Sequence, residues 1–140
     1  MSARTIFHPK GWLTLFAILH TLMFLAPQLF ATATVVDMNW GEGQAPEFAL
    51  FYEQMMGTLG IGYTPMLLGI AFLTEGTTRA RLTLVTAIGM GLTAAANTGL
   101  IMAQPGYLDD MVAFLIGMPV VIFGGTFVAG LLHLNDGDAS

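Results

Sequence analysis

The sequence predicts an all-α integral membrane protein in which four helices form one up-down bundle. Three observations predict this class: four long apolar segments, few charged residues, and an uneven distribution of Lys and Arg. Hydrophobic residues make up 55% of the 140-residue chain and charged residues only 9%, whereas a soluble domain typically carries about 25% charged residues. A domain of this size buries too little surface to hide so much apolar area from water, so a bilayer is the expected solvent.

Each apolar segment is long enough to cross a bilayer, which takes roughly 20 helical residues. The predicted spans cover residues 11–33, 49–73, 80–103 and 107–134, within a single domain of residues 1–140. The connectors are expected at residues 34–48, 75–78 and 104–106, and short connectors make neighbouring helices pack antiparallel. Pro27, Pro65 and Pro119 lie inside spans and are expected to kink them, because proline removes a backbone hydrogen bond.

The basic residues predict the orientation. Arg4 and Lys10 precede the first span, and Arg79 and Arg81 lie between the second and third. Under the positive-inside rule both termini are therefore expected on the cytoplasmic side, in a bacterial inner membrane or an organellar membrane. A cleaved signal peptide is an alternative, since residues 31–33 (Ala-Thr-Ala) resemble a cleavage site and cleavage leaves three spans.

Composition excludes several classes of function. A net charge of −5 argues against nucleic acid as a partner, because binding to phosphates requires clustered Lys and Arg. The chain has no Cys, which excludes disulfides, thiolate nucleophiles and Cys-ligated metals. No Walker, HExxH or G-x-S-x-G motif is present. We therefore expect no catalytic residue and no metal site, and a role other than an enzyme is favoured.

Small residues mark helix-packing faces, because membrane helices associate by close approach. On the third predicted span such residues recur every fourth position at Ala87, Gly91, Ala95 and Gly99, and the second carries Gly57 and Gly60. Besides the lipid bilayer, the expected partner is another membrane protein or a second copy of the chain. The leading prediction is a non-catalytic accessory or assembly subunit, or a homo-oligomer. Plain packing within the bundle is the alternative explanation of the stripe.

Several polar side chains are expected to gather near the outer membrane surface. Gln28 and Asn97 lie equally far along their spans, roughly 25 Å from the inner start, and Glu53 lies one turn into the second span. The candidate pocket consists of Gln28, Glu53, Asn97, Gln104, Asp109 and Asp110. Such a pocket suits a cation, a proton relay or a lipid headgroup and predicts a carrier or a lipid- or ion-binding bundle. Alternatively, the acidic residues simply lie at the membrane surface.

His20 stands alone near the middle of the first span, without a charged neighbour in the sequence. A neutral imidazole there is a candidate axial ligand for haem iron or chlorophyll magnesium. This predicts a redox or pigment-binding subunit. The alternative is a neutral histidine that hydrogen bonds to a threonine or a carbonyl inside the bundle.

The middle of the chain resembles the DoxX-like group of small four-span membrane proteins. The similarity rests on residues 57–62 (Gly-Thr-Leu-Gly-Ile-Gly), 67–73 (Leu-Leu-Gly-Ile-Ala-Phe-Leu) and 79–82 (Arg-Ala-Arg-Leu), about a quarter of the chain. The resemblance implies a four-helix membrane bundle, and some relatives are subunits of quinone-linked oxidoreductases. It supplies no catalytic residue, and the acidic, Trp-containing first connector departs from the group.

Overall fold

The computed structural model describes residues 2–108 and 112–137, and this part of the chain is helical without any strand. The expectation of an all-α fold is therefore confirmed. The elements in chain order are α1 (Ala3–Ile6), α2 (Pro9–His20), the π-helix η1 (Thr21–Leu25), α3 (Ala26–Phe30), α4 (Thr32–Trp40), α5 (Ala49–Gly60), α6 (Tyr63–Leu73), α7 (Gly76–Met102) and α8 (Val112–Leu132).

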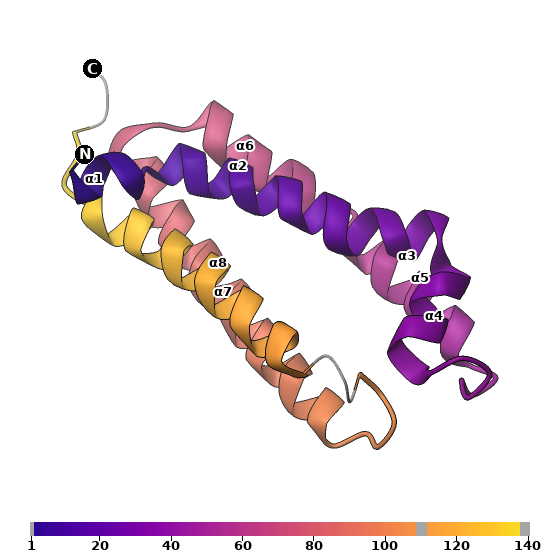
Figure 1. The fold of residues 1–140 in the computed structure, drawn as a ribbon. Coiled ribbons are helices and arrows are strands. Elements are labelled where there is room, and N and C mark those ends of the chain that lie inside the picture. Colours follow the sequence, from indigo (N-terminus) through magenta and orange to yellow (C-terminus); the bar gives the residue numbers. More distant parts are fainter. Residues whose placement is uncertain (1, 109–111, 138–140) are drawn as a thin grey trace.

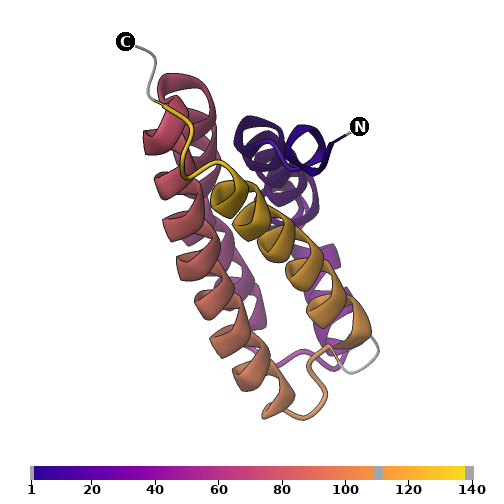
Figure 2. The same cartoon turned by 90° about the vertical axis from the view of Figure 1, so that its left-hand side faces the viewer.

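Two long helical hairpins make up the molecule (Figure 1). In the first, α2, η1 and α3 form one rod that runs beside α5 and α6; in the second, α7 runs beside α8. The hairpins meet at the end that carries both termini and diverge toward the other end. Figure 2 shows the same polarity, with both termini at one end and the connector after α7 at the other. These ends are called the terminal end and the distal end below.

Hydropathy identifies candidate membrane-spanning helices. Ala3–Phe30, Ala49–Leu73 and Gly76–Met102 are each long and apolar enough to cross a bilayer, and Ile116–Leu132, the described part of α8 in this respect, is apolar as well. Large side chains such as Phe30, Leu92 and Leu100 are 87%, 68% and 71% exposed. Water disfavours so much exposed apolar surface, so these helices indicate a membrane protein.

The prolines interrupt the helices in different ways. In a regular α-helix the ring of Pro27 would clash with the carbonyl group four residues before it. The wider turn of η1 precedes Pro27, and the Ala26 N–H donates to the Thr21 carbonyl five residues back. The second predicted span breaks at residues 61–62, and Pro65 lies in the first turn of α6, where no N–H donor is needed. Pro119 lies inside α8.

Three expected boundaries differ from the structure. Residues 34–48 were expected to be a loop, but α4 covers Thr32–Trp40 and ends at Gly41, whose φ of 84° favours glycine. Helix α7 begins at Gly76, before the predicted residue 80, and Tyr107 and Leu108, which were predicted to open the fourth span, lie outside a helix. The connector between α7 and α8 is consequently longer than the expected residues 104–106.

The hydrophobic core lies where the two hairpins meet. Leu13, Phe16 and Ala17 of α2 pack with Leu67 and Ala71 of α6 and with Ile122 of α8. Close backbone contacts support this packing. A Cβ on Gly125 would lie 2.1 Å from the ring of Trp12, and one on Gly130 would lie 2.7 Å from Leu84 Cγ. Glycine at both positions lets α8 approach α2 and α7.

Candidate functional site

A fully buried carboxylate lies at the distal end of the first hairpin. Glu53 on α5 is 0% exposed, and three neutral side chains donate hydrogen bonds to it. Gln28 Nε2 donates to Oε2, and Asn39 Nδ2 and the Tyr107 hydroxyl donate to Oε1, each at 2.9 Å. We call Gln28, Asn39, Glu53 and Tyr107 the Glu53 cluster. It joins α3, α4, α5 and the connector after α7.

A glycine allows the close approach that forms the cluster. Gly57 lies one turn beyond Glu53 on α5, and a Cβ there would lie 2.9 Å from Gln28 Cβ and 3.3 Å from Leu29 Cδ2. Any larger residue would push α5 away from α3, lengthening the hydrogen bond between Gln28 and Glu53. Gly57 was predicted to be a packing residue, and the structure places it directly beneath the buried carboxylate.

The connector after α7 is attached to the cluster at two points. Besides the Tyr107 hydroxyl, the Leu108 N–H donates to the Asn39 carbonyl oxygen at 2.7 Å. Leu108 has a φ of 57°, a left-handed conformation that costs a residue with a side chain about 1–2 kcal/mol. The two hydrogen bonds therefore hold a strained backbone against α4 and α5.

Aromatic rings surround the tyrosine of the cluster. The Tyr107 ring centroid lies 4.7 Å from that of Trp40 and 6.4 Å from that of Tyr52, and Trp40 also contacts Phe48. Trp40, Tyr52 and Tyr107 thus gather at one end of the molecule. Burial and then the negative charge of Glu53 raise the pKa of Tyr107 above its ordinary value, so the hydroxyl stays a neutral donor.

The carboxylate lacks a cationic partner in the described part of the chain, where the ion pairs are those of Asp136 with Arg4 and His133. Gln28 Oε1 is buried and accepts no hydrogen bond. The free lone pair on Glu53 Oε2 and those of Gln28 Oε1 are unfilled acceptor positions. Because an isolated buried charge is costly, this arrangement suits a bound proton or a small cation. Among the described residues no cluster of three His, Asp or Glu side chains forms a metal site.

The structure brings together only part of the predicted polar pocket. Gln28 and Glu53 are in hydrogen-bond contact. Gln104 is exposed and lines a groove of about 330 Å³ together with Trp40 and Gln44. Asn97 is half-buried on α7 and is not one of the three donors to Glu53. Asp109 and Asp110 lie outside the described residues.

Two members of the cluster were missed from the sequence. Asn39 belongs to the segment expected to be a loop, and Tyr107 is the first residue of the fourth predicted span. The acceptor itself was the available signal. Glu53 lies four residues before Gly57 and so shares its helix face, where a buried carboxylate requires donors nearby, and Asn39 and Tyr107 are donors at the same end of the bundle.

His20 belongs to a second polar chain, beside the π-helix. Its Nδ1 lies 3.1 Å from Thr64 Oγ1, which lies 2.9 Å from Thr21 Oγ1, and Thr21 donates to the Ala17 carbonyl oxygen. Because the Thr21 proton is used on Ala17, the consistent assignment is that Thr64 donates to Thr21 and His20 Nδ1–H donates to Thr64. This leaves Nε2 as an acceptor.

The surroundings of His20 bear on the predicted pigment or haem. Phe24 and Tyr63 have ring centroids 5.4 and 5.7 Å from the imidazole. Nε2 lies 3.5 Å from the place that a Cβ on Gly60 would occupy. A macrocycle on Nε2 therefore requires movement of α5. An axial ligand role for His20 stays a prediction, and an absorption band of the purified protein beyond the protein absorption is its test.

The small-residue stripe of α7 divides into two halves. Near the terminal end Ala87 is buried, and a Cβ on Gly91 would lie 3.8 Å from Phe123 of α8. Toward the distal end Ala95 and Gly99 are exposed, and no atom of the described residues lies within 4 Å of the Cβ position of Gly99. The first half packs inside the chain and the second half is uncovered.

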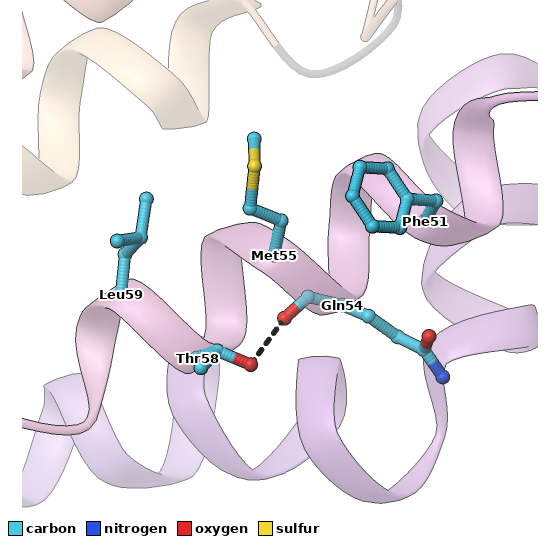
Figure 3. A pocket seen from close by; sticks show the side chains of 5 residues that line it. All are labelled: Phe51, Gln54, Met55, Thr58 and Leu59. Atoms are coloured by element: carbon cyan, nitrogen blue, oxygen red, sulfur yellow. Dashed lines mark hydrogen bonds between the residues drawn. The ribbon is translucent and has the colours of Figure 1, made fainter.

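A further groove of about 340 Å³ lies along α5. Figure 3 shows Phe51, Met55 and Leu59 pointing to one side of the helix, with the Thr58 hydroxyl donating to the Gln54 carbonyl oxygen at 2.9 Å. The threonine hydroxyl is thus satisfied locally. The groove offers mainly apolar contact, as expected of a surface that faces lipid.

The chain matches no protein-family model, no curated protein and no solved structure. The resemblance to DoxX-like proteins therefore stays a prediction.

Proposed function

We propose that this chain is a four-span integral membrane protein that binds a cation, the proton included, at the Glu53 cluster. The observation that supports this proposal is a fully buried carboxylate whose partners are all neutral donors. An ionisable residue inside a membrane segment is costly and marks a functional site by default. The unfilled acceptor on Gln28 supplies a second ligand atom beside the carboxylate.

Thermal unfolding in detergent tests this function. The Tm of the wild type should change when choline chloride is replaced by sodium, potassium or lithium chloride at constant ionic strength, or when the pH is lowered. This change in Tm should depend on the Glu53 carboxyl group. The variant Glu53→Gln should lose this dependence, whereas Glu47→Gln, on the exposed connector before α5, should keep it. Equal responses of the wild type and Glu53→Gln under every condition would refute binding at Glu53.

The proposed topology has four spans and both termini on the cytoplasmic side. It is supported by the contact between Arg4 and Asp136 and by the hydrogen bond from His133 Nε2 to the Arg4 carbonyl oxygen, which keep both ends of the chain together. Because the chain lacks Cys, single cysteines are clean probes. Ser2→Cys and Asn135→Cys should react with an impermeant reagent from one side, and Gly43→Cys and Pro105→Cys from the other. Labelling of Ser2→Cys and Gly43→Cys from the same side would contradict four spans.

A second candidate function is that of an accessory subunit or homo-oligomer, and the uncovered half of the α7 stripe favours it. Ala95 and Gly99 are exposed while Ala87 and Gly91 pack within the chain, so a partner helix has access to the distal half. The double variant Ala95→Leu/Gly99→Leu should abolish a larger species on a native gel. Gly89→Leu, at an exposed glycine of α7 outside the stripe, is the control, and unchanged migration of the double variant would contradict association through this stripe.

A further inference from the structure

We propose that Glu53 is a reversible proton-binding site: the proton is taken up on Oε2, and the Gln28 carboxamide turns to accept a hydrogen bond from it. The inference rests on the proposed function and names the ligand of the same site. It follows from which acceptor positions of the Glu53 cluster are filled and which are not.

The position of the proton follows from the lone pairs of the carboxylate. Oε1 already accepts two hydrogen bonds, from Asn39 and Tyr107, which fills its two acceptor positions. Within the described part of the chain, Oε2 accepts one hydrogen bond, from Gln28. An added proton therefore bonds to Oε2, leaving the contacts of Oε1 in place.

The Gln28 side chain can serve both protonation states. A carboxamide donates through nitrogen and accepts through oxygen, and the two ends exchange places when the group turns by half a rotation. In the present orientation Nε2 donates to Oε2 while Gln28 Oε1 is buried without a donor. After protonation the turned amide places Gln28 Oε1 beside Glu53 Oε2, and Gln28 Oε1 accepts a hydrogen bond from the new O–H group. An Arg or Lys at this position could serve only the ionised state.

No cationic side chain among the described residues contacts Glu53, which is fully buried and accepts hydrogen bonds from three neutral side chains. Among the described residues, Glu53 interacts electrostatically with the titratable side chains of Tyr107 and Tyr52. Neither of these side chains supplies a positive charge. Asp37 on α4 is exposed, and Asp109 and Asp110 lie outside the described residues.

The proton step balances without another reactant. One O–H bond forms on Oε2, the carboxylate charge is neutralised, and the proton comes from water. Since hydrogen bonds to a charged acceptor are roughly twice as strong as neutral ones, protonation weakens the bonds from Asn39 and Tyr107. The connector that holds Leu108 at a positive φ is then less firmly attached. Trp40 contacts Tyr107 and lines the neighbouring groove.

Infrared difference spectroscopy during a pH titration tests the inference. The wild type should show a carboxylic acid carbonyl band that appears as the pH is lowered, is absent in Glu53→Gln and is retained in Glu47→Gln. In Gln28→Leu the band should move to the higher frequency of an acid without a hydrogen-bond acceptor. Should Glu53→Gln not fold, Glu53→Asp should shift the band, and carbon-13 labelling of glutamate identifies it.

The outcomes separate this inference from the proposed function. Absence of any band that depends on Glu53, across the pH range in which the protein stays folded, overturns proton binding. If sodium still shifts the Tm in a way that Glu53→Gln abolishes, the site binds a metal cation and only the proton inference fails. If both responses are absent, both proposals fail.

Discussion

At the scale of single residues, the cluster around Glu53 shows what helical spacing can and cannot predict. Glu53 lies four and seven residues before Gly57 and Gly60, so it shares their side of the helix, and the structure buries it. Distance along a span placed Gln28 and Asn97 at similar depth. The depth of a residue in the membrane does not specify which way its side chain points around the helix, or to which hairpin the helix belongs. Gln28 and Asn97 therefore differ: Gln28 donates to Glu53, whereas Asn97 on α7 does not.

Removing the Glu53 carboxylate should be strongly destabilising. In Glu53→Ala three donors lose their acceptor, the buried Gln28 and Tyr107 and the half-buried Asn39, and each buried unsatisfied polar group costs about 1–3 kcal/mol. We therefore expect a large fall in the Tm measured by circular dichroism in detergent. Glu47→Ala, an exposed carboxylate on the preceding connector, should unfold like the wild type. A stability of Glu53→Ala equal to that of the control would show that the cluster is not formed.

Removing only the Tyr107 hydroxyl should have a smaller effect. In Tyr107→Phe the ring contacts with Trp40 and Tyr52 remain, and Asn39 still donates to Oε1. A hydrogen bond to a charged group contributes about 1.5–3 kcal/mol, so the destabilisation should lie near that range. Tyr63→Phe is a matched control on α6. Denaturant titrations measure the free energy of unfolding of both variants. If Tyr63→Phe lost as much stability as Tyr107→Phe, the Tyr107 hydroxyl would have no specific role.

At the scale of elements, the prolines and glycines decide how each helix runs and what it approaches. The sequence predicted an interruption at each proline, but Pro27 follows a π-helix, Pro65 begins α6 and Pro119 lies within α8. The form of the interruption depends on which neighbouring groups can satisfy the freed carbonyls, and this is a tertiary property. The position of Gly57, in contrast, was predictable, because small residues mark helix contacts.

A methyl group at Gly57 should separate α5 from α3. The added Cβ of Gly57→Ala would lie 2.9 Å from Gln28 Cβ, and overpacking of this kind costs about 1–3 kcal/mol. Gly69→Ala on α6 has no atom within 4 Å of the new Cβ and should be neutral or stabilising, since alanine favours helix. Thermal unfolding of the two variants checks the difference. A destabilisation of Gly69→Ala as large as that of Gly57→Ala would contradict the proposed close approach.

At the scale of the whole molecule, the hairpins are joined near the terminal end and diverge toward the distal end (Figure 1). Hydropathy predicted the class and the approximate spans because it requires only the composition of each helical stretch. The divergence could not be predicted, because it depends on how the side chains of α2, α6 and α8 fit together in the core. At the terminal end Arg4, His133 and Asp136 also connect the two ends of the chain.

The pH dependence of stability should reveal this terminal contact. The hydrogen bond from His133, followed by the charges of His133 and Arg4, lowers the pKa of Asp136 below its usual value of 3.8. A carboxyl whose pKa is lower in the folded state stabilises the fold above its unfolded pKa and loses this effect as the pH falls through the folded value. Asp136→Asn should therefore have a slightly lower Tm than the wild type at neutral pH, and the difference should vanish in acid once the pH is below the lowered pKa of the folded state. Asp37→Asn, exposed on α4 at the distal end, should show no such difference. A gap between wild type and Asp136→Asn that persists in acid would mean that the Asp136 charge does not hold the two termini together.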